Sequence, residues 1–301
     1  TRRRCAVDLV RSMGRTFEAQ TTQICGNRLM AMLQEYAADP TNKWRLKDAA
    51  LQLLVAVSAK TSTTTAQGVS QTNAAIDIMD IVNHHVLPEL QVPGRPHGGG
   101  LEQLPIIRAD CIKFLLTFRN QVPLESMRAV FPLVVAHLQS SSRVVQSYAA
   151  ACLERMLTVK EPRAAPHGGG GGGGGGGARF GRGELQAHIQ ATFEGLFVIL
   201  TKTDESFENP FVMKAIMRCL NVAQEDVVPL TEMLLGSLNQ ALGRVCKNPR
   251  DPQFNHYLFE SVAVLVGNAC RSNPSFTTNF EQLLFPPFQQ VLAQDVTEFN
   301  P

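Results

Sequence analysis

VFPLVVAHLQSSSRVVQSYAAACLERML, residues 130–157, contains a complete two-helix unit. Pro132 lies near the start of an apolar stripe, where we expect the first turn of a helix, because the missing N–H of proline is tolerated there. The three serines that follow predict a turn and an N-cap. In the second half Val145, Ala149 and Leu153 recur every fourth residue, so they share one face of a helix. Two short amphipathic helices cannot bury their apolar faces alone, which predicts copies of this unit on either side.

The spacing of Val145, Ala149 and Leu153 recurs along the chain. From one copy to the next the steps are 45, 61, 38, 67 and 46 residues, and three of them are close to the ~40–47 residues of HEAT repeats. The first copy is imperfect because Thr1 is polar. The other copies of the second helix are Thr1–Cys5–Leu9, Leu46–Ala50–Leu54, Ile107–Cys111–Leu115, Val212–Ile216–Leu220 and Leu258–Val262–Val266.

Proline-bearing apolar segments recur between these copies and predict the partner helices. They are residues 86–90, 130–138, 227–238 and 284–292, and the proline-free run 184–200 fills the remaining place. The sequence therefore predicts an all-α fold, a HEAT-repeat α-solenoid of about six helix pairs that forms one continuous array over residues 1–301.

Three segments exceed the usual length of a connection between helices. Residues 14–73 predict a repeat with an extended insertion, in which 27–37 form an additional helix and 60–73 a polar stretch. Residues 91–103 predict a flexible connector. Residues 161–183 contain ten consecutive glycines and predict a disordered linker, since glycine loses the most entropy on ordering and buries no side chain.

The composition excludes several classes of protein. A net charge of +2 without a basic run gives no reason to expect nucleic acid as a partner. No apolar run is long enough to predict insertion into a membrane. Seven widely spaced cysteines are typical of reduced thiols. The chain starts without Met and inside a helical pattern, so we expect a segment of a longer protein.

No cluster predicts catalysis, a metal or a cofactor. His84 and His85 are adjacent and therefore diverge on a helix, and the glycine run lacks the lysine and the preceding strand of a phosphate loop. Cys5 and Cys111 occupy the small buried position of the repeat. Glu154 and its charged neighbours are expected on solvent faces. An enzyme would need a site built from distant residues.

A solenoid of this kind usually acts by binding a partner along its surface. We expect exposed, partner-facing side chains on the second helices and in the insertion. Arg3, Asp48 and Glu260 are further expected exposed positions. The candidate contact residues are Lys60, Gln67, Gln71, Asn73, Lys113, Gln146, Lys214, Arg218, Asn255 and His256.

Several segments resemble a known family in order and spacing. They are TRRR and DLVR (1–11), MLQEYA (32–37), KDAA (47–50), FRNQVP (118–123), YAA and LER (148–155), MKAIMR (213–218) and FNHYLFE (254–260). Together they resemble the central region of the CAS-type exportins, importin-β-like receptors that return importin-α from nucleus to cytoplasm. The long insertion that this family carries in a central repeat matches residues 17–73.

The resemblance implies importin-α and GTP-bound Ran as partners, with Ran bound mostly by repeats outside this segment. It also implies contact with nuclear pore proteins, shuttling between nucleus and cytoplasm, and no cofactor. The glycine run and the slightly basic charge depart from the family's pattern. The alternative from periodicity alone is a HEAT-repeat scaffold that does not depend on Ran.

Overall fold

The computed structural model describes residues 2–60, 68–91, 104–160, 177–201 and 208–294. Within these ranges the chain forms helix after helix, and its β-structure is limited to two isolated bridges. These bridges join Ala59 to Thr72 and Lys160 to Ala178. The predicted all-α fold is confirmed.

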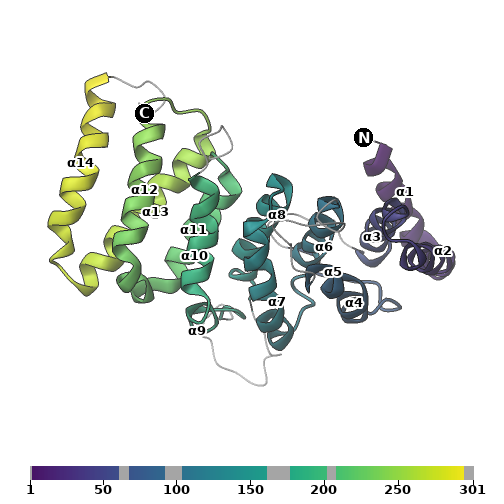
Figure 1. The fold of residues 1–301 in the computed structure, drawn as a ribbon. Helices are drawn as coiled ribbons and strands as arrows, with labels where there is room; N and C mark the ends of the chain where they lie inside the picture. Colours follow the sequence, from purple (N-terminus) through teal and green to yellow (C-terminus); the bar gives the residue numbers. More distant parts are fainter. Residues whose placement is uncertain (1, 61–67, 92–103, 161–176, 202–207, 295–301) are drawn as a thin grey trace, which may run out of the picture. The chain divides into compact units, whose positions relative to one another are not determined.

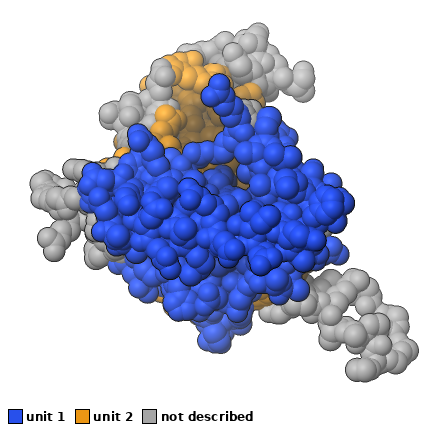
Figure 2. Space-filling model, turned by 90° about the vertical axis from the view of Figure 1, so that its right-hand side faces the viewer, with its two compact units in different colours: residues 1–134 blue, residues 135–301 orange. Residues whose placement is uncertain are grey.

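The chain divides into two compact units, residues 1–134 and 135–301, which are coloured separately in Figure 2. A π-helical turn, Val82–Val86, joins α4 to α5. The last two residues of α7 fall in the second unit. The first unit contains α1 (Arg2–Thr16), α2 (Glu18–Ala38), α3 (Trp44–Ser58), α4 (Ile78–Ile81), α5 (Leu87–Gln91), α6 (Pro105–Thr117) and α7 (Leu124–Ala136).

The second unit begins near a 3₁₀ turn, His137–Gln139, and a longer 3₁₀ segment, Gln224–Leu230, precedes α12. Its α-helices lie side by side in Figure 1. They are α8 (Arg143–Met156), α9 (Arg182–Gln186), α10 (Ile189–Leu200), α11 (Pro210–Ala223), α12 (Thr231–Val245), α13 (Pro252–Ser272) and α14 (Phe276–Gln294).

In each unit one second helix packs against several neighbouring helices. In the first unit α3 packs against α1, α2 and α6, and in the second α11 packs against α8, α10 and α13. Large apolar side chains fill both cores. In the first, the tilted rings of Phe114 and Phe118 have centroids 4.6 Å apart, and in the second Phe193, Leu153 and Phe254 are buried. Removing such apolar surface from water is the main force that holds helix layers together.

The predicted repeat register holds on three second helices. Every member of the copies on α6, α8 and α11 is buried, while Leu46 and Val266 are half-buried. The first copy is wrong, because Cys5 is exposed and Leu9 is 61% exposed. Helix α1 contacts its neighbours through a different face, which carries the half-buried Val7 and Val10.

The predicted place of Pro132 is also wrong. Helix α7 begins at Leu124, so Pro132 lies inside it and not in its first turn. Prolines also lie inside α14 and in the 3₁₀ segment before α12. An internal proline removes one backbone hydrogen bond of the helix, and prolines inside these helical segments recur among the described residues.

The insertion that was expected at residues 14–73 contains a regular element. Helix α2 extends over Glu18–Ala38 and packs on α1 and α3, so it is the partner helix of its repeat and not an additional one. Residues 61–67, 92–103 and 161–176 lie outside the described residues. The described end of the predicted linker, 177–183, is packed: Arg179 N donates to Val159 O at 2.7 Å and Phe180 is fully buried.

Candidate functional site

A pocket of about 220 Å³ opens in the first unit where α1, α2 and the end of α3 meet. Figure 1 shows these helices grouped near the N-terminus. Val10, Ala56 and Val57 contribute an apolar wall, and Arg11 and Arg15, one turn apart on α1, contribute cationic groups. The pocket therefore combines an apolar surface with positive charge.

Two of the predicted contact residues, Lys60 and Asn73, line this pocket. The Lys60 ammonium lies 2.7 Å from a Glu18 carboxylate oxygen. Asn73 is buried, so it is not an exposed contact residue; its side-chain amide donates to the Thr22 hydroxyl at 2.7 Å. Asn73 thus fixes the pocket wall, whereas Lys60 remains accessible to a ligand.

Residues 68–73 are the last part of the polar stretch 60–73, and we call this short segment the strap. Lys60 N donates to Gln71 O at 3.1 Å, and Asn73 N donates to Ser58 O at 2.9 Å. These two backbone hydrogen bonds pair the strap with the residues at the end of α3. Gln71, a predicted contact residue, is exposed on it.

The other end of the strap is held by the turn after α6. Val69, fully buried, donates from its backbone N to Thr117 O at 3.1 Å. Its carbonyl accepts from the side-chain amides of Asn120 at 3.1 Å and Gln121 at 2.9 Å. Gly68 has φ +72, a conformation that suits glycine. The FRNQVP segment thus anchors the strap.

A cluster of polar groups joins α1, α3 and α6. Arg3 donates to both oxygens of Asp48, at 3.2 and 2.7 Å, and Gln52 donates to Asp110 Oδ1 at 2.8 Å. Lys113, a predicted contact residue, is half-buried and donates to Gln52 Oε1 at 3.4 Å. Arg3 is exposed as expected, but Asp48 is buried, because it receives this guanidinium between the helices.

Asp110 is the unusual member of this cluster. Its Oδ2 is buried and has no hydrogen-bond partner among the described residues. Burial and the neighbouring Asp48 carboxylate raise the pKa of Asp110 to about 7, although Lys113 and Arg3 oppose the shift. A second negative charge so close to Asp48 is disfavoured. The protonated form of Asp110 is therefore favoured between α3 and α6.

A second ion pair, with a buried lysine, joins α3 to α2 and α5. The Lys47 ammonium, 4% exposed, lies 3.6 Å from Glu89 and 5.2 Å from the centre of the Tyr36 ring. The Tyr36 hydroxyl donates to Glu89 at 2.8 Å. Burial, reinforced by Glu89, raises the pKa of Tyr36. Lys47 is buried while Tyr36 and Glu89 are half-buried, and the network joins three helices.

In the second unit, two predicted contact residues lie on α11. The Lys214 ammonium stands 5.3 Å from the centre of the Tyr257 ring. Arg218 lies 3.5 Å from Glu154, which also meets Arg155 at 2.9 Å. Both cations are half-buried, so they are partly occupied by neighbours and partly available to a partner.

Three expected surface positions in this unit are buried. Gln146 donates to Ser140 O at 2.7 Å, Asn255 is enclosed in α13, and Glu154 is 2% exposed between two arginines. Each second helix contacts neighbours on several sides, so a polar residue can face another helix. His256, 3.5 Å from Glu260, is exposed as expected, while Glu260 is half-buried.

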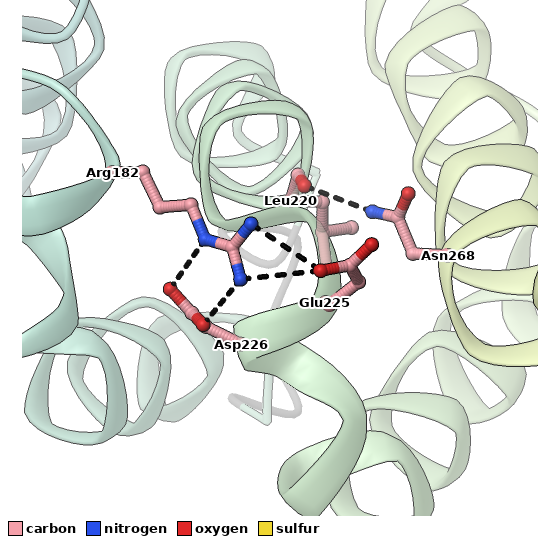
Figure 3. A network of polar contacts seen from close by, with 5 residues as sticks. All are labelled: Arg182, Leu220, Glu225, Asp226 and Asn268. Carbon is pink, nitrogen blue, oxygen red and sulfur yellow. Dashed lines mark hydrogen bonds and ion pairs between the residues drawn. The ribbon is translucent and has the colours of Figure 1, made fainter. Parts of the chain in front are cut away.

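A polar network stabilises the junction between α11 and α12 (Figure 3). Arg182 donates to both oxygens of Asp226, at 2.9 and 2.7 Å, and approaches Glu225 at 3.4 Å. Its guanidinium lowers the pKa of Asp226. Gln224, just before these acids, has φ 50, a strained value for a residue other than glycine. The network fixes this turn.

In the described ranges no group of three or more His, Cys, Asp or Glu side chains could hold a metal ion. Likewise, none of the described helices is long and apolar enough to cross a membrane. Cys111, Cys152 and Cys219 are buried thiols, as expected, and burial raises the pKa of Cys111 and Cys219.

The structure groups the predicted contact residues only in part. Lys60, Gln71 and Asn73 come together at the strap, and Gln67 lies outside the described residues. The pocket cations Arg11 and Arg15 were not predicted from sequence. Their spacing of four residues on a helix was the available signal, but nothing in the sequence placed α1 beside the strap.

Two family models match the chain. The model described as Cse1 matches residues 1–153, and the model described as CAS/CSE protein, C-terminus, matches residues 173–301. The chain belongs to the Cse1 family. The resemblance that the sequence motifs carried is therefore confirmed.

Members of the Cse1 family from animals are similar along the entire chain. Exportin-2 of Bos taurus is 38% identical and that of Homo sapiens 37% identical over 301 residues. A solved structure, "The exportin Cse1 in its cargo-free, cytoplasmic state", matches with a TM-score of 0.80 and 27% identity over 99% of the chain. This match confirms the HEAT-repeat solenoid fold. The chain spans 29% of the length of each of these relatives.

Proposed function

We propose that this protein is a nuclear export receptor that binds importin-α together with GTP-bound Ran and returns importin-α from nucleus to cytoplasm. The observation that carries the proposal is the similarity to Exportin-2 along all 301 residues, at 36–38% identity. It works by binding and not by catalysis. It shuttles between nucleus and cytoplasm and contacts nuclear pore proteins during passage.

The physical basis is the stack of helices within each unit. In such arrays each repeat contacts only its neighbours, so small changes at each interface add up along the stack. A partner shifts the equilibrium between two shapes only by its difference in affinity for them. Ran bound to GTP would act in this way, by favouring the shape that binds importin-α.

The accessible predicted residues are the proposed contact positions. Lys60, Gln71 and His256 are exposed, and Lys113, Lys214 and Arg218 are half-buried. Gln67 is included on sequence grounds. Asn73, Gln146 and Asn255 are buried, so they would support neighbouring contact residues and not touch a partner.

A pull-down with the full-length protein that contains this chain tests the proposal. Immobilised importin-α is offered the protein with Ran loaded with GTP or with GDP. Retention only with the GTP form supports an export receptor. Retention that is indifferent to the nucleotide would instead favour a HEAT-repeat scaffold without Ran dependence.

A further inference from the structure

The pocket between α1, α2 and α3 contains a buried donor that lacks an acceptor. Arg11 Nε is buried and has no hydrogen-bond partner among the described residues. A charged group whose buried donor has no acceptor is incompletely neutralised by the protein. An anion beside the Arg11 guanidinium is therefore favoured at this place.

The charges around the pocket do not cancel. Lys60 and Glu18, 2.7 Å apart, neutralise each other. Arg11 and Arg15 have no carboxylate partner in the part of the chain that the structure describes. The remaining charge at the pocket is positive, which attracts an anion.

The shape and lining restrict the kind of anion. At about 220 Å³ the cavity is small, below the ~300–1,000 Å³ of pockets for drug-sized ligands, so it fits one side chain. Val10, Ala56 and Val57 contribute the apolar part of the lining. Methylene groups suit that wall, and a carboxylate suits the arginine fork. Inorganic phosphate would leave the apolar wall without a contact.

We propose that this pocket binds a glutamate side chain from an acidic segment of a protein partner. The carboxylate lies beside the guanidinium groups of Arg11 and Arg15, and the methylenes lie on the apolar wall. The strap holds the Lys60 and Asn73 sides of the pocket by backbone hydrogen bonds of 3.1 and 2.9 Å. The pocket is thus formed before the ligand arrives, which reduces the entropy lost on binding.

Arginine side-chain NMR tests the proposal on the intact chain. With ¹⁵N-labelled arginine, the Arg11 Nε–H signal is followed while the peptide acetyl-Ala-Glu-Ala-Glu-Ala-amide is added. We expect this signal to shift, because a carboxylate beside the guanidinium changes its electrostatic surroundings, and the same peptide with glutamine in place of glutamate to leave it unchanged. Arg11→Gln identifies the signal by its loss.

Variants separate the pocket from general attraction between charges. Arg15→Gln alters an exposed side chain and preserves the fold, and we expect it to weaken the glutamate peptide about tenfold, the worth of one charge-assisted hydrogen bond. Arg45→Gln is the matched control, because Arg45 is exposed and lies 5.2 Å from the Trp44 ring centre, away from the pocket lining. It should bind like the wild type.

Three results would overturn the proposal. They are equal shifts with the glutamine peptide, inorganic phosphate binding as tightly as the glutamate peptide, and equal losses for Arg15→Gln and Arg45→Gln. The assay contains neither importin-α nor Ran, so its outcome is independent of the proposed transport function.

Discussion

Replacing Asp110 by asparagine should stabilise the first unit, and more strongly as the pH rises. In the wild type the pKa of Asp110 is raised from 3.8 to about 7 by burial and by Asp48. The folded state therefore keeps a proton that the unfolded state loses. Its stability falls as the pH rises from about 4 to about 7 and then levels off. An asparagine amide can donate to Asp48 at every pH.

The expected magnitude follows from the shift. One pKa unit corresponds to about 1.4 kcal/mol, and screening by partial solvent access lowers the effect of the full shift. Asp110→Asn should therefore exceed the wild type by roughly 2–4 kcal/mol in free energy of unfolding at pH 8, and equal it within about 1 kcal/mol at pH 4.

Urea denaturation followed by Trp44 fluorescence is the suitable assay. Trp44 is the single tryptophan of the chain and lies at the start of α3, so it reports on the first unit. Asp8→Asn is the control, because Asp8 is 60% exposed on α1 and 3.9 Å from Arg4. A variant difference that is the same at pH 5 and pH 8, or an Asp110→Asn protein less stable at pH 8, would refute the raised pKa of Asp110.

Five further substitutions test the packing. Leu153→Ala empties a fully buried site on α8 and should cost about 2–5 kcal/mol, measured as faster hydrogen exchange of α8 and α11; unchanged exchange would contradict the register. Gly68→Ala places a Cβ 2.9 Å from a guanidinium, at a position with φ +72. It should lower the free energy of unfolding, followed by Trp fluorescence, by about 1–3 kcal/mol. Its control, Gly26→Ala, lies in open space on α2 and should raise that free energy by about 0.5–1 kcal/mol. Asn268→Ala removes a buried 3.1 Å hydrogen bond to the end of α11 and should lower the free energy of unfolding by about 1–3 kcal/mol. Arg182→Gln changes an exposed network and should lower it by less than about 1 kcal/mol. A larger loss for Arg182→Gln than for Asn268→Ala would contradict the burial argument.

The periodic part of the fold could be predicted from sequence. Val145, Ala149 and Leu153 are buried because the helical period places them on one side. The same spacing failed at Cys5 and Leu9, because the contact face of α1 is set by where α2 and α3 lie and not by the period alone.

The candidate site was predictable only in part. Lys60 and Asn73 were selected because a polar stretch interrupts the repeat, and both line the pocket. Arg11 comes from another helix, and its orphaned donor exists only once three segments are assembled. Gln146 and Asn255 were misplaced because a polar residue between helices has the same sequence signature as one facing water.

The proposal of Ran-dependent export is tested most directly by measuring thermodynamic coupling with the full-length protein. Titration calorimetry gives the affinity for importin-α with and without GTP-bound Ran, and the affinity for GTP-bound Ran with and without importin-α. The account predicts that each partner tightens the other by the same factor, about tenfold or more, since coupling between binding sites is reciprocal. A factor of one in both directions would contradict it.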